Sequence, residues 1–486
     1  MESTASPREP SLLDALIPLI ALVVMLVMSV TIFKDNSSYG PNQISLLLCA
    51  CIAGLVALKN GMAWRAVEKG FVKGISLALG AILILFAVGA LIGSWILAGV
   101  VPTMIYFGLQ ILDPSIFYAA TCLICAFIAL SIGSSWTTAG TVGVGLMASA
   151  VGLNLSPEIT AGAIISGAYF GDKMSPLSDT TNLAPAVAGS ELFSHIHHMT
   201  WTTIPAIVLT FIIFLFLGIS SSNETSQDDI EKILLALESS FTIGWYLLIP
   251  LVLVLVLAMK KVPAFPTILI GALIGCVFAA IFQQEAIATF VNDPSLSTVR
   301  TTLQGVWTVL FDSFAASTDN EQLNELLSRG GMSSMHNTVW LIICAMSFGG
   351  VLEHTGLLKR IVQSILSMVS TTSALISATI ASGIGTNIVT ADQYISIILP
   401  GRMFREEYRK RKLAAVNLSR ALEDSATLTS VLVPWNTCGA FMASTLGVAT
   451  MAYFPYCFFN LITPIISILY GVWHIKIKLL EEEDAV

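Results

Sequence analysis

The sequence predicts an all-α protein that crosses a membrane many times and is built from two inverted repeats. Of its 486 residues, 55% are hydrophobic and only 11% are charged, and the mean hydropathy is +0.82. A soluble domain has about a quarter of its residues charged. Long apolar runs and two motifs that recur at a fixed spacing complete the prediction. The eight cysteines lie inside apolar runs, which fits buried thiols rather than a disulfide or zinc framework.

Apolar runs long enough to enter or cross a bilayer follow one another along the whole chain. The first is expected to be retained, because no basic region or cleavage signal precedes it. The runs lie at about 12–33, 42–58, 75–100, 115–152, 159–190 (interrupted), 202–220, 243–259, 264–282, 337–356, 372–401, 413–452 and 454–475.

The charge of the connecting segments predicts their sides. Segments 59–73 and 402–412 are rich in Lys and Arg and are expected inside, whereas 222–242 and 283–330 are dominated by Asp and Glu and are expected outside. These sides agree only if 115–152 and 372–401 each enter and leave on one side, as re-entrant helical hairpins. Both termini are then cytoplasmic.

Two sequence windows repeat 252 residues apart. The first break, I-G-S-S-W-T-T-A-G at 132–140, matches I-G-T-N-I-V-T-A-D at 384–392, and the same shift places Asp172 on Asp424. The chain is therefore divided into a first repeat at 1–221, an acidic linker at 222–242 and a second repeat at 243–486. Each repeat is expected to hold about five transmembrane helices, a re-entrant hairpin and an interrupted helix, and the loop charges make the repeats inverted. The site elements are 115–200 and 372–452.

Gly167–Asn182 is the stretch that looks least like a membrane helix. It reads G-A-Y-F-G-D-K-M-S-P-L-S-D-T-T-N, and Pro176 removes a backbone donor, so a helix is expected to break there. In hydrocarbon, a broken backbone survives only where it lines a cavity or is packed inside the protein. This stretch therefore predicts a binding site.

Five carboxylates are expected at membrane depth: Asp172, Asp179, Asp392, Glu423 and Asp424. Burial favours the protonated form of a carboxyl group, whereas a bound cation favours the ionised form. One group can thus hold either a proton or Na⁺. Hydroxyl, amide and carbonyl oxygens are ligands suited to a small hard cation, and the further candidates are Ser134, Ser135, Thr137, Thr138, Ser175, Thr180, Asn182, Thr386, Asn387, Thr390, Ser425, Thr427 and Asn436. The alternative is that Asp172 and Asp424 pair with Lys173 or cap half-helices, and that single hydroxyls bond back to their own helix.

The chain resembles the NhaC family of sodium/proton antiporters through three motifs: G-A-Y-F-G-D-K-M-S-P-L-S-D-T-T-N-L-A-P at 167–185, G-S-S-W-T-T-A-G-T at 133–141 and L-E-D-S-A-T-L-T-S-V-L-V-P-W-N-T-C-G at 422–439. The resemblance implies a bacterial inner-membrane exchanger with paired hairpins and an elevator-like displacement. It also covers exchangers that couple sodium and protons to small organic acids such as malate and lactate.

The expected function is Na⁺/H⁺ antiport in which Asp172 and Asp424 hold the metal ion Na⁺ or a proton in alternation. The alternative is a coupled carrier of a small carboxylate, although no arginine lies inside the motifs to clamp one. No nucleophile–base or zinc-ligand spacing indicates an enzyme, and no cofactor or nucleic-acid partner is expected beyond the transported ions and the lipid bilayer. A homodimer is expected, with 12–58 and 243–282 as scaffold and contact.

Overall fold

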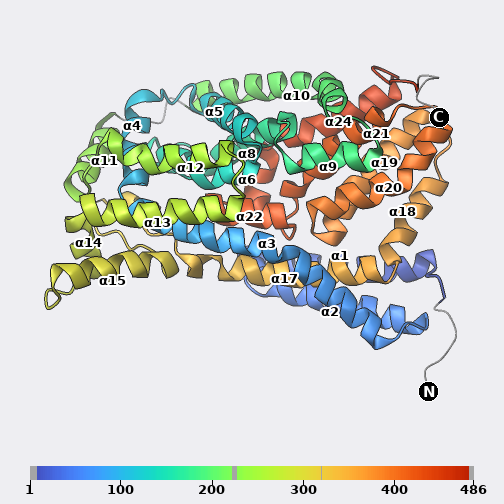
Figure 1. Ribbon diagram of the computed structural model, residues 1–486, viewed down its shortest axis with the longest axis horizontal. Helices are drawn as coiled ribbons and strands as arrows, with labels where there is room; N and C mark the ends of the chain where they lie inside the picture. The colour runs from blue at the N-terminus through green and yellow to red at the C-terminus, as the bar shows by residue number, and fades with distance from the viewer. Residues whose placement is uncertain (1–7, 222–226, 319, 481–486) are drawn as a thin grey trace.

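The computed structural model describes residues 8–221, 227–318 and 320–480, and over these ranges the chain is helical with no β-strand (Figure 1). Within the described ranges, seven helices are long and apolar enough to cross a membrane, or up to nine spans if each of two bent helix pairs counts as one. This confirms the prediction of a polytopic α-helical membrane protein. The seven are α1 (Leu12–Phe33), α2 (Pro41–Lys59), α3 (Trp64–Leu97), α10 (Leu192–Ser221), α13 (Ala264–Phe282), α17 (His336–His354) and α19 (Thr372–Thr390).

Shorter helices make up the rest of both halves. The first half adds α4 (Val100–Ile111), α5 (Phe117–Ile132), α6 (Ser135–Thr138), α7 (Val144–Gly152), α8 (Pro157–Met174) and α9 (Asp179–Ala188). The second half and its connections add α11 (Gln227–Ser240), α12 (Ile249–Met259), α14 (Gln284–Val291), α15 (Thr298–Phe311), α16 (Glu321–Leu327), α18 (Leu357–Ser367), α20 (Gln393–Lys410), α21 (Ala415–Leu422), α22 (Thr437–Leu446), α23 (Thr450–Tyr453) and α24 (Phe458–Val472).

The chain doubles back between α5 and α8. Helix α5 ends at Gly133, whose positive φ of 78° suits a residue without a β-carbon. The return arm, α6 with α7, runs antiparallel to α8: Ser135 bonds to Asp172 near one end, and the N–H of Ser156 donates to the Tyr118 hydroxyl at 3.0 Å at the other. Both ends of segment 115–152 therefore lie at the same end of the bundle, as a hairpin requires.

The second hairpin, α19 with α20, also doubles back, and its break lies at the very end of the predicted window. Thr379 Oγ1 and Tyr408 Oη are 3.1 Å apart across the two arms. The sequence comparison placed the break at 384–392, whereas α19 continues through Thr390 and ends at Ala391, which has a positive φ of 58°. A glycine inside a helix destabilises it by only about 0.5–1 kcal/mol relative to alanine, so Gly383 and Gly385 do not interrupt α19.

The breaks of the two halves recur at a spacing of 258 residues rather than 252. Ser134 and Asp392 begin the return arms of the two hairpins, and Ser178 and Asn436 begin α9 and α22. Both of those helices have ten residues. In this register Asp172 corresponds to Ser430, so Asp424 is not its counterpart. The inverted relation of the two halves stays a prediction.

Two connections are more helical than the sequence indicated. The basic segment 59–73 is mostly the start of α3, because no proline interrupts the chain after Trp64 and the helix extends past the apolar run. The segment 283–330 contains α14 to α16, and the N–H of Gly331 donates to the carbonyl of Gly89 in α3 at 2.7 Å. Of the acidic linker, residues 222–226 lie outside the described residues and most of the remainder is α11.

Basic and acidic segments lie at opposite ends of the molecule. The start of α1 meets the end of α2 through the Lys59–Asp14 ion pair at 2.8 Å, at the right in Figure 1, where α18 and α20 also lie. Helices α4, α11, α14 and α15 lie at the left (Figure 1). The last described segment returns to the right-hand end, where Leu413 and Leu479 form an isolated β-bridge.

Candidate functional site

The two hairpin breaks and the two broken helices meet at one cavity of about 490 Å³. Its other wall consists of α3 and the turn between α12 and α13. At the breaks, some backbone N–H and C=O groups have no partner within a helix. The breaks can therefore present these polar groups to the cavity. The lining residues are Leu77, Gly80, Ala81, Ile84, Ile132, Gly133, Ser134, Ser135, Trp136, Thr137, Asp172, Leu177, Ser178, Asp179, Thr180, Ala258, Lys261, Val262, Pro263, Ala264, Thr267, Asp392, Gln393, Tyr394, Thr437 and Cys438.

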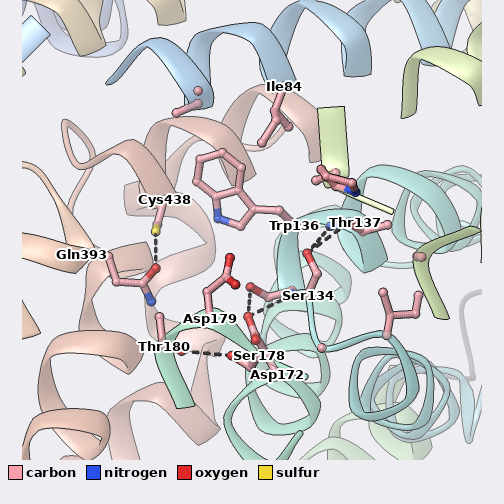
Figure 2. A pocket seen from close by; sticks show the side chains of 18 of the residues that line it. Ile84, Ser134, Trp136, Thr137, Asp172, Ser178, Asp179, Thr180, Gln393 and Cys438 are labelled. Carbon is pink, nitrogen blue, oxygen red and sulfur yellow. Dashed lines mark hydrogen bonds between the residues drawn. The ribbon is translucent and has the colours of Figure 1, made fainter. Parts of the chain in front are cut away.

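Asp172 is the most firmly positioned carboxylate of the cavity (Figure 2). It lies in the last turn of α8, which ends because Pro176 favours an extended conformation at Ser175 (φ −81°, ψ 127°). Its Oδ2 accepts the N–H of Ser135 at 3.0 Å and the hydroxyl of Ser135 at 2.6 Å. Hydrogen bonds to a carboxylate stabilise its ionised form. The two hydrogen bonds from Ser135 therefore fix the Asp172 carboxyl group in position at the cavity wall.

The remaining acidic groups of the cavity lie at the starts of α9 and α20. Asp179 is the exposed first residue of α9, after Ser178 has capped that helix. In Figure 2 the side chains of Asp172, Asp179 and Ser178 converge on the space below Trp136. Asp392 caps α20 by accepting the N–H of Ile395 at 2.8 Å.

The charge of the lining favours a cation. Among the described residues that line the cavity, Asp172, Asp179 and Asp392 contribute three carboxylates, whereas the exposed Lys261 is the single lysine and there is no arginine. The hydroxyls of Ser134, Ser135 and Thr137 add neutral oxygen atoms. Carboxylate, hydroxyl and carbonyl oxygens are the ligands that hard metal cations prefer.

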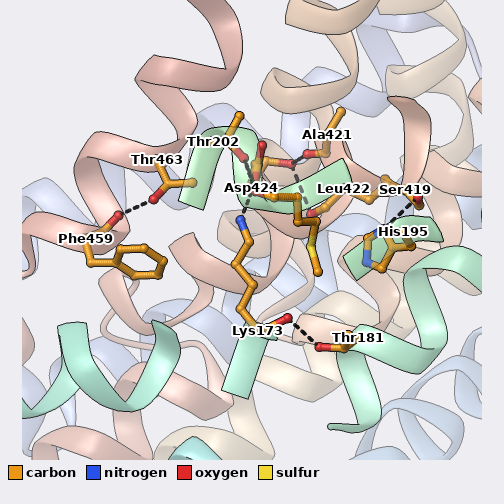
Figure 3. Close-up of polar contacts among 12 residues, drawn as sticks. Lys173, Thr181, His195, Thr202, Ser419, Ala421, Leu422, Asp424, Phe459 and Thr463 are labelled. Atoms are coloured by element: carbon orange, nitrogen blue, oxygen red, sulfur yellow. Dashed lines mark hydrogen bonds and ion pairs between the residues drawn. The ribbon is translucent and has the colours of Figure 1, made fainter. Parts of the chain in front are cut away.

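A second buried polar cluster lies on the other side of α8 (Figure 3). Lys173 and Asp424 form an ion pair in which both side chains are fully buried, and the hydroxyl of Thr202 donates to the same Asp424 oxygen at 3.2 Å. Glu423 is also fully buried. Asp424 thus has an internal cation as its partner, which is the alternative that the sequence left open.

The structure divides the predicted site residues into two groups. Those that line the cavity are Ser134, Ser135, Thr137, Asp172, Asp179, Thr180 and Asp392. Those outside its lining are Thr138, Ser175, Asn182, Thr386, Asn387, Thr390, Glu423, Asp424, Ser425, Thr427 and Asn436.

Most of the second group has a visible structural role. The hydroxyls of Thr138, Thr386, Thr390 and Ser425 donate to the carbonyl four residues earlier, as serine and threonine commonly do in helices. Near the break before α9, Ser175 Oγ accepts the N–H of Leu177, and the Asn182 amide donates to the carbonyls of Pro176 and Ser178.

Asn387 and Asn436 connect three elements of the second half. The side-chain amide of Asn436 donates to Asn387 Oδ1 at 3.2 Å, and its oxygen accepts the N–H of Cys438 at the start of α22. The Asn387 amide in turn donates to the carbonyl of Ala426 at 2.6 Å. These two residues fix the geometry of the second break.

Sequence reasoning missed several lining residues. Trp136 stacks on Phe441 with ring centroids 4.1 Å apart, and it lies inside a recognised motif. Gln393 Oε1 accepts from the Cys438 thiol, and it directly follows Asp392. The wall residues of α3 are 77, 80, 81 and 84, which share one face of the helix. A long apolar helix has several such faces, and its sequence does not show which one borders a cavity. No sequence signal singled out Lys261.

Comparison with known proteins adds independent findings. A family model described as the Na⁺/H⁺ antiporter family matches residues 167–475. The chain is 40% identical to the Na⁺/H⁺ antiporter NhaC of Alkalihalophilus pseudofirmus over 88% of this chain and 89% of that protein. It is 37% identical to a malate-2H⁺/Na⁺-lactate antiporter of Bacillus subtilis, over 96% and 97% of the two chains. It is 32% identical to the arginine/ornithine antiporter ArcD of Halobacterium salinarum, over 98% and 95%.

Proposed function

Because this chain belongs to the Na⁺/H⁺ antiporter family, we propose that it is a transporter, not an enzyme, and that it exchanges Na⁺ for H⁺ across a bacterial inner membrane. The observation that carries this proposal is the cavity in which Asp172 is held by Ser135 beside two further carboxylates. An ionised carboxylate with neutral oxygen atoms around it suits a dehydrated alkali cation, and the low polarity of the surroundings strengthens the attraction.

Exchange requires that Na⁺ and H⁺ compete. Asp172 lies in α8, and Glu423 and Asp424 lie in the turn that follows α21. A negative charge on a buried carboxyl group is costly inside a membrane protein unless a cation or a proton neutralises it. A carrier loaded with either ion therefore crosses more readily than an empty one. This difference makes transport of one ion depend on the return of the other.

The first prediction tests Asp172 directly. In everted vesicles, Na⁺ added to a respiration-generated pH gradient should dissipate it, as read by a ΔpH-sensitive dye. Asp172→Asn removes the charge while keeping the shape of the side chain. We expect the response to fall by more than about 90%, because a tenfold weaker interaction with Na⁺ corresponds to about 1.4 kcal/mol. Asp293→Asn, in the exposed turn after α14, is the matched control and should behave as wild type. Sodium-driven dissipation by Asp172→Asn at the wild-type level would refute the assignment.

An organic substrate is the second candidate, and the size of the cavity favours it. About 490 Å³ exceeds what one Na⁺ and a few waters fill, at about 30 Å³ per water. Two relatives are named for the exchange of organic acids or amino acids. Proteoliposomes with and without a sodium gradient should be offered labelled malate, lactate and arginine. Because three carboxylates line the cavity, we expect no sodium-driven malate or lactate uptake; sodium-dependent uptake of either would replace the first candidate.

The charge distribution supports an orientation with both termini in the cytoplasm. The basic segment 402–412 and the start of α1 lie at one end of the molecule, and the acidic connections lie at the other (Figure 1). Positively charged segments remain on the cytoplasmic side. Dimerisation through 12–58 and 243–282 stays part of the proposal.

A further inference from the structure

We propose that the exchanged proton is carried by Glu423, a residue outside the cation cavity, and that Na⁺ and H⁺ therefore compete through electrostatic coupling between two separate sites. This inference rests on the proposed Na⁺/H⁺ exchange and specifies where each ion resides. Its basis is the different surroundings of the buried carboxylates on α8 and on the turn after α21.

Among the described carboxyl groups of α8 and of the turn after α21, Glu423 has the fewest hydrogen bonds to support a negative charge. Its side chain is fully buried, and neither of its oxygens has a hydrogen-bond partner among the described residues. An ionised carboxylate in such a place is strongly disfavoured. Asp172 differs because Ser135 donates two hydrogen bonds to it, and Asp424 differs because it pairs with Lys173. The three carboxyl groups therefore differ in how many polar partners support a negative charge on them.

The turn that contains Glu423 also holds a side chain that can accept a hydrogen bond from its proton. Glu423–Thr427 is a π-helical turn, an uncommon feature that is often found at functional sites. The Thr427 hydroxyl lies near the Glu423 carboxyl group, is itself buried and lacks a hydrogen-bond partner among the described residues. A protonated Glu423 that donates to Thr427 would satisfy both groups at once. An ionised Glu423 could instead accept a hydrogen bond from the Thr427 hydroxyl, so this neighbour suits both states of a proton carrier.

Glu423 is close enough to the cavity to respond to its occupancy. Lys173 of α8 favours a negative charge on Glu423 and Asp172 opposes one, and the Thr180 hydroxyl, which lines the cavity, lies near Glu423. Helix α19, packed against the turn, carries no titratable residue. The titratable groups on the neighbouring elements include Asp179, Asp392, Tyr394, Arg420 and Tyr470, and among the described residues none of these forms a hydrogen bond or ion pair with Glu423.

This placement explains why exchange would be obligatory. Na⁺ at Asp172 cancels a negative charge near Glu423, so that Glu423 can release its proton. Loss of Na⁺ restores the charge of Asp172 and favours protonation of Glu423. The sodium-loaded and proton-loaded forms then carry the same buried charge, while the empty form carries one more negative charge and is the costly one to move.

The test counts protons released when Na⁺ binds. Purified protein in weakly buffered detergent receives Na⁺, with a pH indicator reporting H⁺ and ²²Na⁺ reporting binding. For wild type we expect release of about one proton per bound Na⁺. The apparent Na⁺ dissociation constant should fall about tenfold for each unit by which the pH rises, over the range where Glu423 titrates. Glu423→Gln should bind Na⁺ with fewer than about 0.2 protons released and a flat pH profile. Glu423→Asp should restore release, and Glu158→Gln, at the far end of α8 beside Ser156, is the matched control.

Each outcome has a distinct meaning. Absence of any pH dependence in wild type would refute the proposed exchange itself. Undiminished proton release by Glu423→Gln would overturn only the assignment of the proton, as would loss of Na⁺ binding in a monodisperse Glu423→Gln, which would make Glu423 a cation ligand. If Glu423→Gln does not fold, infrared difference spectra decide: on Na⁺ addition, wild type should lose a protonated-carboxyl band that is displaced in frequency in Glu423→Asp. An identical band in both proteins would refute the proposal.

Discussion

At the scale of the residue, the contrast between two ion pairs shows how burial decides the value of a charge. Lys173 and Asp424 are both fully buried, whereas Lys59, paired with Asp14, keeps 67% of its side chain exposed. An exposed pair contributes about 0–1 kcal/mol, but removing one partner of a buried pair destabilises a protein by about 3–5 kcal/mol, because it leaves an uncompensated charge. Each member of the Lys173–Asp424 pair therefore needs the other as its counter-charge inside the protein.

The prediction at this scale concerns stability. Asp424→Asn should lower the free energy of unfolding in detergent by about 3–5 kcal/mol, since it leaves the ammonium group of Lys173 buried and unpaired. Lys59→Met should change it by less than about 1 kcal/mol. Chemical denaturation followed by tryptophan fluorescence measures both.

The double variant Lys173→Met/Asp424→Asn provides the internal check. It leaves no unpaired charge, so it should be more stable than Asp424→Asn alone. If the double variant is less stable than Asp424→Asn, the unpaired charge of Lys173 is not what destabilises the single variant.

At the scale of the element, the position of Asp172 depends on how closely α8 approaches α5. Gly167 and Gly171 face the backbone of α5, and a β-carbon at either position would collide with main-chain atoms of Cys122, Ala126 or Leu130. Small residues allow membrane helices to approach closely. The close contact fixes α8 against the hairpin, and so brings Asp172 to the N–H of Ser135.

The prediction at this scale compares two glycines. Gly167→Ala should lower the free energy of unfolding by about 1–3 kcal/mol, because the added methyl group overpacks the α5–α8 contact. Gly385→Ala, in α19, has no atom within 4 Å of the added carbon and should be neutral or stabilise by up to about 1 kcal/mol. Thermal unfolding in detergent ranks the two. Equal melting temperatures would mean that α5 and α8 can separate without loss.

At the scale of the whole molecule, the cavity lies between two sets of elements. One wall is made of both hairpins and both broken helices, and the other of α3 and the α12–α13 turn. From the sequence we expect the site elements 115–200 and 372–452 to move against the scaffold 12–58 and 243–282; the α12–α13 turn belongs to that scaffold, and α3 adds a segment that the prediction left out. A cavity along that boundary is where displacement would change access to a bound ion.

The prediction at this scale is accessibility. Ser178 is fully buried, lines the cavity and caps α9. In a background without the native cysteines, which include Cys438 in the lining, a Ser178→Cys variant should be labelled by a membrane-impermeant maleimide from either face of oriented vesicles. Na⁺ and pH should change the ratio of the two rates by about tenfold, corresponding to about 1.4 kcal/mol between the two positions. Labelling from one face under all ionic conditions rules out displacement.

The sequence by itself determined the class of protein and the break after α8 that contributes to the candidate site. Hydropathy establishes that the chain is a multi-span helical membrane protein, and Pro176 establishes that α8 must end beside Asp172, because both effects act locally along the chain. Tertiary structure alone decided which carboxylates share a cavity. The 252-residue motif match paired Asp172 with Asp424, but α8 turns its neighbouring residues to different sides, so that Asp172 faces the cavity while Lys173 meets Asp424 on the other side. A partner 251 residues distant in sequence is selected by packing, and no local pattern records it.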